Sequence, residues 1–398
     1  MSVLIERDGS LGRRDVLKLA GSALFGNAVC RLGLATSVAA TAVLVDLLPA
    51  YAQSEKKTIE RKRSSQAFNG KTMFEWMTDL KDKDVSVRER AVAALKVYEE
   101  EARDAAPLII KAIGDPDMSL RVNAIITLGF IGMSEKDRSD GISALKYRVA
   151  KDPQGIVRFQ AAVALGRLRE DAYEAVSSLI EATRDSLGRD NHCWELRQAA
   201  LGALATAAWK PTGGFDMSAY KAALSALRDL CVEVRLQAVL TLIYFGKPGA
   251  VADQRAAIGA LQPVVSRETE NKRVRMWARV AIMRIEDEKK FDNKHEKELP
   301  LISILLKDKD MGTRVHAGRA LAFMGDKAKS QIPELIEALD DKEPQVVVQV
   351  LIALGAMKSA AERATSAIKR MLQHPDPAVK QAAANALNEI GEKQKQAP

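Results

Sequence analysis

The chain has little of the material from which disulfide scaffolds, multi-ligand metal sites and turn-rich β structures are built. Its 398 residues include only 3 Cys and 4 His, too few for a disulfide-dense fold or for a metal site with several such ligands. Aromatic residues make up 5%, and 24 Gly with 13 Pro are about 9% of the chain, below the roughly 12% of average proteins. This composition favours stacked helices over β structure.

Charge of one sign is also scarce. The 60 Lys and Arg face 52 Asp and Glu, which leaves a net charge of +8. Most charges are interspersed, so the balance favours solubility and disfavours nucleic acid as a partner. The one concentrated basic run, residues 55–63, is interpreted as a solvated linker, with contact to an anionic lipid or polyanion as the alternative.

Residues 1–52 differ from the rest of the chain. Arg13 and Arg14 precede mostly apolar sequence that is too short to span a membrane, and Ala50 and Ala52 fit a signal peptidase that cleaves before Gln53. The paired arginines resemble the twin-arginine export signal, although neighbouring positions depart from it and leave the export route open. We expect an exported, periplasmic or cell-envelope protein. The alternative is an uncleaved amphipathic membrane anchor, because charges interrupt the apolar stretch.

One pattern recurs from residue 70 onward: an aliphatic residue, an anchor that is usually Arg (position 0), Ala at +3, Ala or Thr at +6, and Leu or Ile at +7. The anchors are Arg88, Arg121, Arg158, Arg197, Arg235, Arg275, Arg314, Val347 and Lys380. They lie 33 to 40 residues apart, the period of helical hairpins. We therefore predict an all-α solenoid of about nine repeats, with a signal peptide at 1–52, a basic linker at 53–69, the solenoid at 70–392 and a polar tail at 393–398.

Each repeat is expected to contain a first helix, a turn and a second helix that carries the anchor. Residues 106–113 and 332–339 are examples of the first helix, and 114–117 of the turn. Pro presets the turn backbone, while Asp caps the next helix. Residues 70–80 are predicted to form the first helix of the array, with Phe74 and Trp76 covering its open end.

These residues resemble the HEAT-repeat family, specifically its phycobilisome-lyase-type variant with the motif Asp-x-x-Val-Arg-x-x-Ala-x-x-Ala-Leu-x-x-Ile-Gly, which residues 117–132 match almost throughout. The resemblance implies a right-handed α-solenoid and a structural Asp–Arg ladder. The spacing predicts that each Asp bonds locally to the basic residue four positions later, in the pairs Asp84–Arg88, Asp117–Arg121, Asp310–Arg314 and Asp376–Lys380. A phosphate-binding row of arginines is the alternative.

Catalytic patterns are not found. Gly70-Lys71-Thr72 lacks the earlier Gly and the strand of a phosphate-binding loop. His295-Glu296 is one pair, whereas the HEAT-like deoxyhypusine hydroxylase uses several, and it lies in a charged segment that we expect to be solvated. Cys193 and Cys231 occupy equivalent places in adjacent repeats, where free buried thiols are expected. We predict no catalytic residue, metal or cofactor, and hence no enzyme.

A partner would bind where the repeat motif leaves positions free. On the second helix, positions +1, +2, +5 and +9 lie opposite the core positions and are expected to line the concave surface. Many are apolar: Val122, Ile126, Phe130, Phe159, Val163, Leu236, Leu240, Tyr244, Met276, Trp277, Val280, Phe323, Val348 and Ile352. Polar residues among them could bond a peptide backbone or acidic side chains: Asn123, Gln160, Arg167, Gln237, Arg284, Arg319 and Gln349.

The sequence therefore predicts a non-catalytic scaffold that binds a protein or peptide segment along this row. The competing interpretation is tight curvature that buries the row against neighbouring helices. Two other functions stay open: handling of a tetrapyrrole, by resemblance to the phycobilisome lyases, and polyanion binding through the basic linker. A membrane is expected only through an uncleaved N-terminal segment. The inserts at 210–214 and 247–249 are interpreted as loops.

Overall fold

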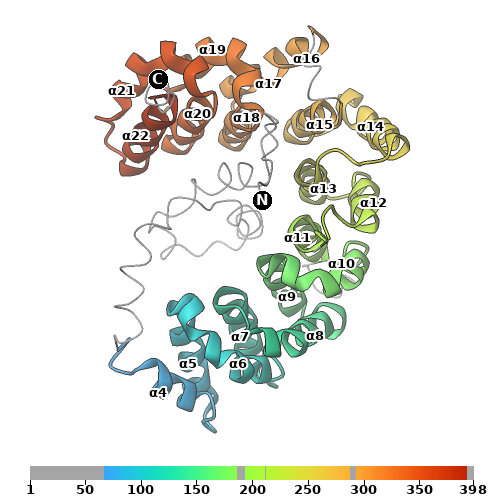
Figure 1. The fold of residues 1–398 in the computed structure, drawn as a ribbon, viewed down its shortest axis with the longest axis vertical. Helices are drawn as coiled ribbons and strands as arrows, with labels where there is room; N and C mark the ends of the chain where they lie inside the picture. The colour runs from blue at the N-terminus through green and yellow to red at the C-terminus, as the bar shows by residue number, and fades with distance from the viewer. Residues whose placement is uncertain (1–66, 186–192, 211, 287–292, 392–398) are drawn as a thin grey trace, which may run out of the picture. The chain divides into compact units, whose positions relative to one another are not determined.

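The computed structural model describes residues 67–185, 193–210, 212–286 and 293–391 (Figure 1). The predicted signal peptide, with Arg13, Arg14, Ala50, Ala52 and Gln53, lies outside the described residues, as do most of the basic linker and the polar tail. The described residues form helices, with two isolated β-bridges and no strand. The fold is therefore an all-α solenoid of HEAT-type hairpins, as predicted. Among the described residues, no helix is both long and apolar enough to cross a lipid bilayer.

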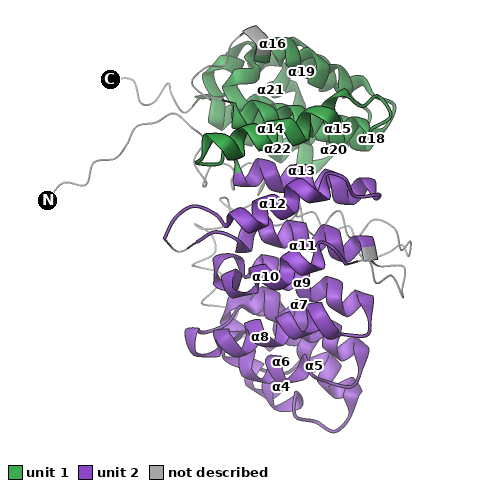
Figure 2. Cartoon of the chain, turned by 90° about the vertical axis from the view of Figure 1, so that its right-hand side faces the viewer, with its two compact units in different colours: residues 1–35, 44–50, 246–398 green, residues 36–43, 51–245 purple. Residues whose placement is uncertain are grey.

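The described chain divides into two compact units (Figure 2), of which unit 2 ends at residue 245. In unit 2 the second helices of the hairpins, called B helices here, are α5 (Val85–Val97), α7 (Met118–Ile131), α9 (Gly155–Arg167), α11 (Cys193–Ala207) and α13 (Val232–Phe245). The first helices are α4 (Met73–Asp79), η1 (Glu99–Ala105) with α6 (Ala106–Ala112), α8 (Glu135–Lys151), η2 (Arg169–Ala175) with α10 (Val176–Ala182), and α12 (Met217–Ala226). Each B helix packs against the B helix of the adjacent repeat.

Unit 1 contains the described residues from 246 onward. Its B helices are α15 (Lys272–Ile285), α18 (Met311–Met324), α20 (Pro344–Ala356) and α22 (Pro377–Gly391). Its first helices are α14 (Val251–Ser266), then α16 (Asn293–Glu298), α17 (Pro300–Ser303) and η4 (Ile304–Lys307), then η5 (Gly325–Gln331) with α19 (Ile332–Ala338), and η6 (Lys358–Ala364) with α21 (Thr365–Met371).

Asp four residues before the anchor caps the B helix. The side chains of Asp84, Asp117 and Asp310 accept hydrogen bonds from backbone N–H groups of the first turn, which satisfies donors that lack a partner inside the helix. The first helix of the array begins later than predicted, at Met73, because Thr72 caps it in a capping box with Glu75.

The predicted cover at the open end is only half correct. Trp76 is buried, and its Nε1 donates to the backbone oxygen of Phe68 at 3.1 Å. Phe74 is 75% exposed and covers nothing in the described structure. Residues two positions apart point to nearly opposite sides of an α-helix, so only one of the two rings can face the stack.

The Ala at +3 and the Leu at +7 form the core of the stack, as the pattern predicts. Ala91, Ala124 and Ala161 have no exposed surface, and neither do Leu128 and Leu165. In the last described repeat Leu387 is only half-buried.

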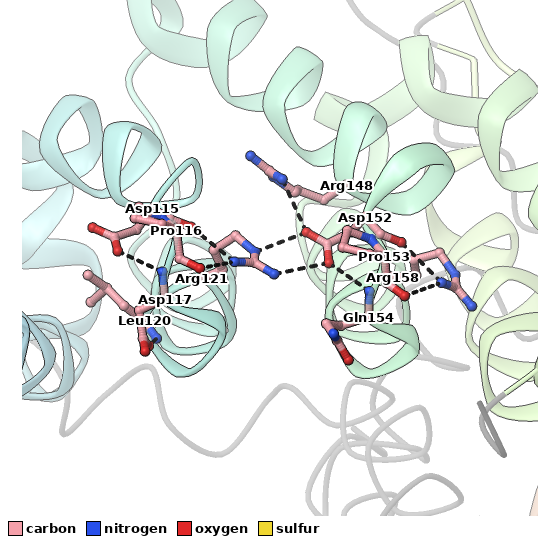
Figure 3. A network of polar contacts seen from close by, with 10 residues as sticks. All are labelled: Asp115, Pro116, Asp117, Leu120, Arg121, Arg148, Asp152, Pro153, Gln154 and Arg158. Carbon is pink, nitrogen blue, oxygen red and sulfur yellow. Dashed lines mark hydrogen bonds and ion pairs between the residues drawn. The ribbon is translucent and has the colours of Figure 1, made fainter. Parts of the chain in front are cut away.

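The Asp–Arg ladder connects successive repeats, which corrects the predicted local pairing (Figure 3). Arg121 donates from Nε and Nη2 to Asp152 of the following turn, at 3.0 and 3.3 Å, and from Nη1 to the backbone oxygens of Asp115 and Pro116 in its own turn. Asp117, the predicted partner, is occupied as the helix cap. Figure 3 shows Arg148 approaching the same Asp152, with an ion-pair distance of 3.1 Å.

The same arrangement recurs in both units. The ladder pairs are Arg88–Asp115, Arg121–Asp152, Arg158–Asp185 and Arg197–Asp229 in unit 2, and Arg314–Asp341 in unit 1. The arginine side chains in these pairs are 8 to 18% exposed. Because their guanidinium groups already face a carboxylate, this row is structural and offers no free charge to a phosphate.

Candidate interaction face

The candidate site is the set of side chains at +1, +2, +5 and +9 of the B helices, called the B-helix face below. Nine of the predicted partner-binding residues are at least partly exposed there: Val122, Ile126, Phe130, Leu236, Leu240, Tyr244, Phe323, Val348 and Ile352. Five are instead buried in the stack: Phe159, Val163, Met276, Trp277 and Val280. The face is therefore interrupted at α9 and α15, where the predicted row belongs to the core.

α9 packs closely against its neighbour α11. A Cβ atom on Gly166 would lie 3.0 Å from the Cα of Ala203 on α11, so α9 and α11 approach nearly backbone to backbone. Phe159 and Val163 on α9 are buried. The sequence pattern gave the direction of these side chains but not the distance to the next helix.

Phe130, at the C-terminal end of α7, is the most exposed of the predicted partner-binding residues in unit 2. Its side chain is 37% exposed, and the guanidinium carbon of Arg167 lies 3.9 Å from the ring centroid. The Lys96 ammonium lies 5.5 Å from the same centroid, and Val97 beside it is 45% exposed. An apolar side chain flanked by two cations can hold an apolar residue that has an acidic neighbour.

On α13 the half-exposed Leu236, Leu240 and Tyr244 continue the face of unit 2. Tyr244 packs edge-on against Trp209, with centroids 6.2 Å apart. Trp209 and Phe215 pair at the base of the predicted insert, and Phe215 stacks on Phe245 at 4.8 Å. The two residues that flank the insert are therefore held against α13 by aromatic packing.

In unit 1 the equivalent positions carry a buried polar row. The Trp277 Nε1 donates to His316 Nδ1 at 2.9 Å, and both residues are buried, as is Gln349 on α20. Arg319 Nε donates to Gln349 Oε1 at 3.3 Å. Nearer the helix ends, the guanidinium of Arg284 lies 5.1 Å from the ring centroid of Phe323, the same cation–aromatic pairing at +9 as Arg167 with Phe130.

His316 is the residue of this row that the sequence did not single out. Burial, and after it the positive charges of Arg319 and Arg273, lowers the pKa of His316 from 6.5 to about 3. The imidazole is therefore neutral at physiological pH, with Nδ1 as an acceptor. The sequence does indicate His316 indirectly, because it lies at +2, the position at which Gln237 and Gln349 occur in other repeats.

The side chains of Cys231 and His295 each contact a carboxylate. Cys231 is half-buried and donates to Glu233 Oε2 at 2.9 Å, and burial together with this carboxylate raises the pKa of the thiol. His295 was predicted to be solvated, and this is wrong: the side chain is buried, with Nε2 3.1 Å from Glu286 Oε2. Within the described ranges no group of three or more His, Cys, Asp or Glu is placed to hold a metal ion.

A surface depression of about 320 Å³ lies beside the ladder of unit 1, away from the B-helix face. Its walls include Asp308, Arg314 and Asp341, which are occupied in ion pairs. Lys307 and Glu337 form a further ion pair at 2.8 Å. The depression therefore offers no unpaired charge from these residues to a ligand.

Comparison with known proteins agrees with the repeat architecture. A family model described as HEAT repeats matches residues 75–166 and 332–398. An engineered protein of known crystal structure is 19% identical, with a TM-score of 0.41, covering 88% of this chain and 98% of its own. Escherichia coli YibA is 15% identical, with a TM-score of 0.36, covering 88% of this chain and 100% of its own. The search of curated proteins found no match.

Neither TM-score is high enough to support a functional inference. The family match and the hairpin architecture are consistent with each other, since both matched regions consist of paired helices with the anchor on the second. Residues 75–166 and 332–398 are HEAT repeats, within an all-α solenoid of such hairpins.

Proposed function

We propose that the protein is a non-catalytic scaffold that binds a polypeptide segment along its B-helix face. The observation that carries the proposal is the row of nine apolar side chains that remain partly exposed after the helices have stacked. Stacking uses the Ala at +3 and the Leu at +7, so this row is not needed for the core. Apolar side chains at repeated positions, on α7 and α13 in unit 2 and on α18 and α20 in unit 1, are suitable anchors for apolar residues of a bound segment.

Cations next to the exposed rings define the preferred chemistry. Arg167 and Lys96 flank Phe130, and Arg284 faces Phe323. A partner that presents an apolar residue next to Asp or Glu would place the apolar residue at Phe130 and its carboxylate near Lys96. Aromatic and arginine side chains are the ones that most often dominate binding energy in such interfaces.

Partner capture with matched variants tests this proposal. The full chain is chemically crosslinked to its partners in its own cells, and the products are compared with those of Phe130→Glu and Leu240→Glu. The control is Tyr147→Glu on α8, whose side chain is 58% exposed outside the B-helix face. We expect the two face variants to lose a partner that the control keeps.

Circular dichroism must show that all variants keep their helices, since a lost fold would also lose the partner. Val280 is unsuitable for this test because it is completely buried and a charge there would disrupt the core. If the folded face variants keep every partner while the Tyr147 variant loses one, binding takes place on the first helices and the proposal is wrong.

We further propose that the protein acts outside the cytoplasm. This proposal is supported only by the pattern of residues 1–52, namely the paired arginines, the apolar stretch and the small residues at 50 and 52. Its partner would then be an exported or envelope protein.

A further inference from the structure

One arginine of unit 1 differs from those of the ladder. Arg314 and Arg319 lie on the same helix, α18, one and a half turns apart. Arg314 makes a bidentate pair with Asp341, at 2.6 and 3.1 Å. Arg319 has a neutral partner instead, the Gln349 amide oxygen, 3.3 Å from its Nε. Within the described residues, Arg319 forms no ion pair with a carboxylate.

The guanidinium of Arg319 is half-buried, and its terminal nitrogens remain available. Neither Nη atom has a hydrogen bond within the described structure, and neither belongs to the buried unsatisfied atoms, so both keep contact with solvent. Burial lowers the pKa of Arg319, which means that the site disfavours the positive charge it holds. A desolvated cation without a counter-ion is costly unless a ligand supplies one.

The neighbouring groups do not neutralise this charge. His316 is buried and neutral, and Arg273 adds a second cation close enough to influence it. Asp310, a carboxylate whose charge acts on His316, caps α18 by accepting from the N–H and the hydroxyl of Thr313, both at 2.7 Å, and it also interacts with the positive charge of Arg273. Positive charge is therefore in excess at this position of the B-helix face.

We infer that Arg319 is a carboxylate-binding site, at which an acidic group of the bound polypeptide makes a bidentate contact with the two Nη atoms. The planar guanidinium fork matches the two oxygens of a carboxylate. Gln349 holds Nε and thereby fixes the orientation of the fork. Half-exposed apolar side chains at Phe323, Val348 and Ile352 lie on the same and the adjacent helix, where they can contact residues that flank the acidic group.

This inference rests on the proposed function and names the chemistry that unit 1 recognises. Its test needs no knowledge of the partner, because small carboxylates serve as probes. Trp277 reports on the site through its hydrogen bond to His316. The protein has 4 Trp, so selective ¹⁵N labelling of tryptophan gives few indole signals in the full chain, and Trp277→Phe identifies the one that belongs to Trp277.

Two probes distinguish the possible sources of the carboxylate. N-acetyl-leucine carries a chain-terminal carboxylate, and N-acetylglutamic acid α-amide carries a side-chain one; each is compared with its uncharged amide at constant ionic strength. We expect at least one acid to shift the Trp277 indole signal in a saturable way, and the amides to leave it in place. Arg319→Gln should weaken the binding at least tenfold, and Arg319→Lys less. Arg255→Gln, on an exposed position of α14, should have no effect.

The inference is overturned if neither acid shifts the signal at concentrations up to about 100 mM. Such a result would exclude any site whose binding free energy is more favourable than about −1.4 kcal/mol. It is also overturned if Arg319→Gln binds the acids unchanged, or if inorganic phosphate binds more tightly than both acids. A stability measurement excludes a merely structural role. Arg319→Gln should keep or raise the urea midpoint, whereas Arg314→Gln should lower it, and an equal loss in both variants contradicts the inference.

The scaffold proposal and this inference can fail separately. If Phe130→Glu and Leu240→Glu lose a partner that Arg319→Gln binds as well as before, the scaffold stands and the carboxylate site is wrong. If the acids bind at Arg319 but no face variant loses a partner, the carboxylate site stands and the scaffold proposal fails.

Discussion

The anchor arginine uses its different nitrogens for different tasks. In Arg121, Nη1 donates to two carbonyl oxygens of its own turn, while Nε and Nη2 reach Asp152 of the next repeat. One side chain therefore closes a turn and joins two repeats. A lysine with a single ammonium cannot offer this fixed fork, which explains why arginine recurs at the anchor through most of the array.

Asp152 is the acceptor on which two cations depend. Its carboxylate has no exposed surface and contacts Arg121 and Arg148. Asp152→Asn would leave both cations beside a neutral group, and we expect a loss of about 3 to 5 kcal/mol in the free energy of unfolding, the usual effect of breaking a buried pair. Urea unfolding of the full chain measures it.

The matched control is Asp171→Asn. Asp171 pairs with Arg138 at 3.3 Å, with the two side chains 49 and 42% exposed, and exposed pairs contribute about 0 to 1 kcal/mol. Equal losses in the two variants would show that the buried ladder pair has no special weight.

His316 gives unit 1 a defined response to acid. Its folded pKa of about 3 lies below the unfolded value of 6.5, so between these values the unfolded chain binds a proton that the folded chain refuses. The stability that this residue contributes is present at neutral pH and is lost as pH falls from about 6.5 toward 3, by up to about 1.4 kcal/mol per pH unit. Protonation would also displace the Trp277 donor from Nδ1.

Comparison with His316→Gln isolates this contribution from those of the other histidines. Thermal unfolding of both proteins between pH 7.5 and 4 should show a steeper fall for the native chain. Parallel curves would mean that His316 titrates normally in the folded state.

At the scale of the element, the B helices share an ending. The residue at +11 has a positive φ in six repeats, and it is Gly at Gly132, Gly246 and Gly325 but not at Glu99, Arg169 and Lys358. A side chain raises the energy of this left-handed conformation, which Gly adopts freely. In four of the six repeats a 3₁₀ segment begins at this residue and leads to the first helix of the following repeat.

Lys358→Gly should therefore stabilise the protein by about 1 kcal/mol, because Lys358 has a φ of 53° and its side chain is exposed. Gly325→Ala should cost more than this, because the φ of 57° and ψ of −135° at Gly325 lie in a region that residues with a side chain rarely enter. Urea midpoints of the two variants measure both effects. A fall in stability for Lys358→Gly would mean that the lysine side chain makes a contact worth more than the backbone strain.

At the scale of the whole molecule, the export proposal makes a prediction about the chain itself. In bacterial cells the protein should be recovered outside the cytoplasm, with a mature N-terminus at Gln53, and changing Arg13 and Arg14 to Lys should keep it inside. Cell fractionation with N-terminal sequencing measures both. Arg31→Lys is the control for the paired arginines. Recovery of the full-length chain in the membrane fraction would instead favour the anchor.

The repeats were predictable in detail because their signal is local and repeated. Each anchor fixes the Ala and Leu that follow it on one helix, and the structure places Ala124 and Leu128 in the core as the spacing indicates. The ladder was predicted with the wrong partner. Asp117 is nearer in sequence to Arg121, but Asp152 is 31 residues away and reaches it only after the next repeat has stacked.

The sequence alone thus determined the helical hairpins, their number and the side of each B helix that faces the core, since these depend on periodicities within a few turns of helix. The tertiary structure decided which free positions stay exposed. Val280 and Leu240 are equivalent in the repeat, yet one is buried and the other half-exposed, because the distance between neighbouring helices is set by packing on both sides. The same packing left Arg319 without a carboxylate while giving one to Arg314.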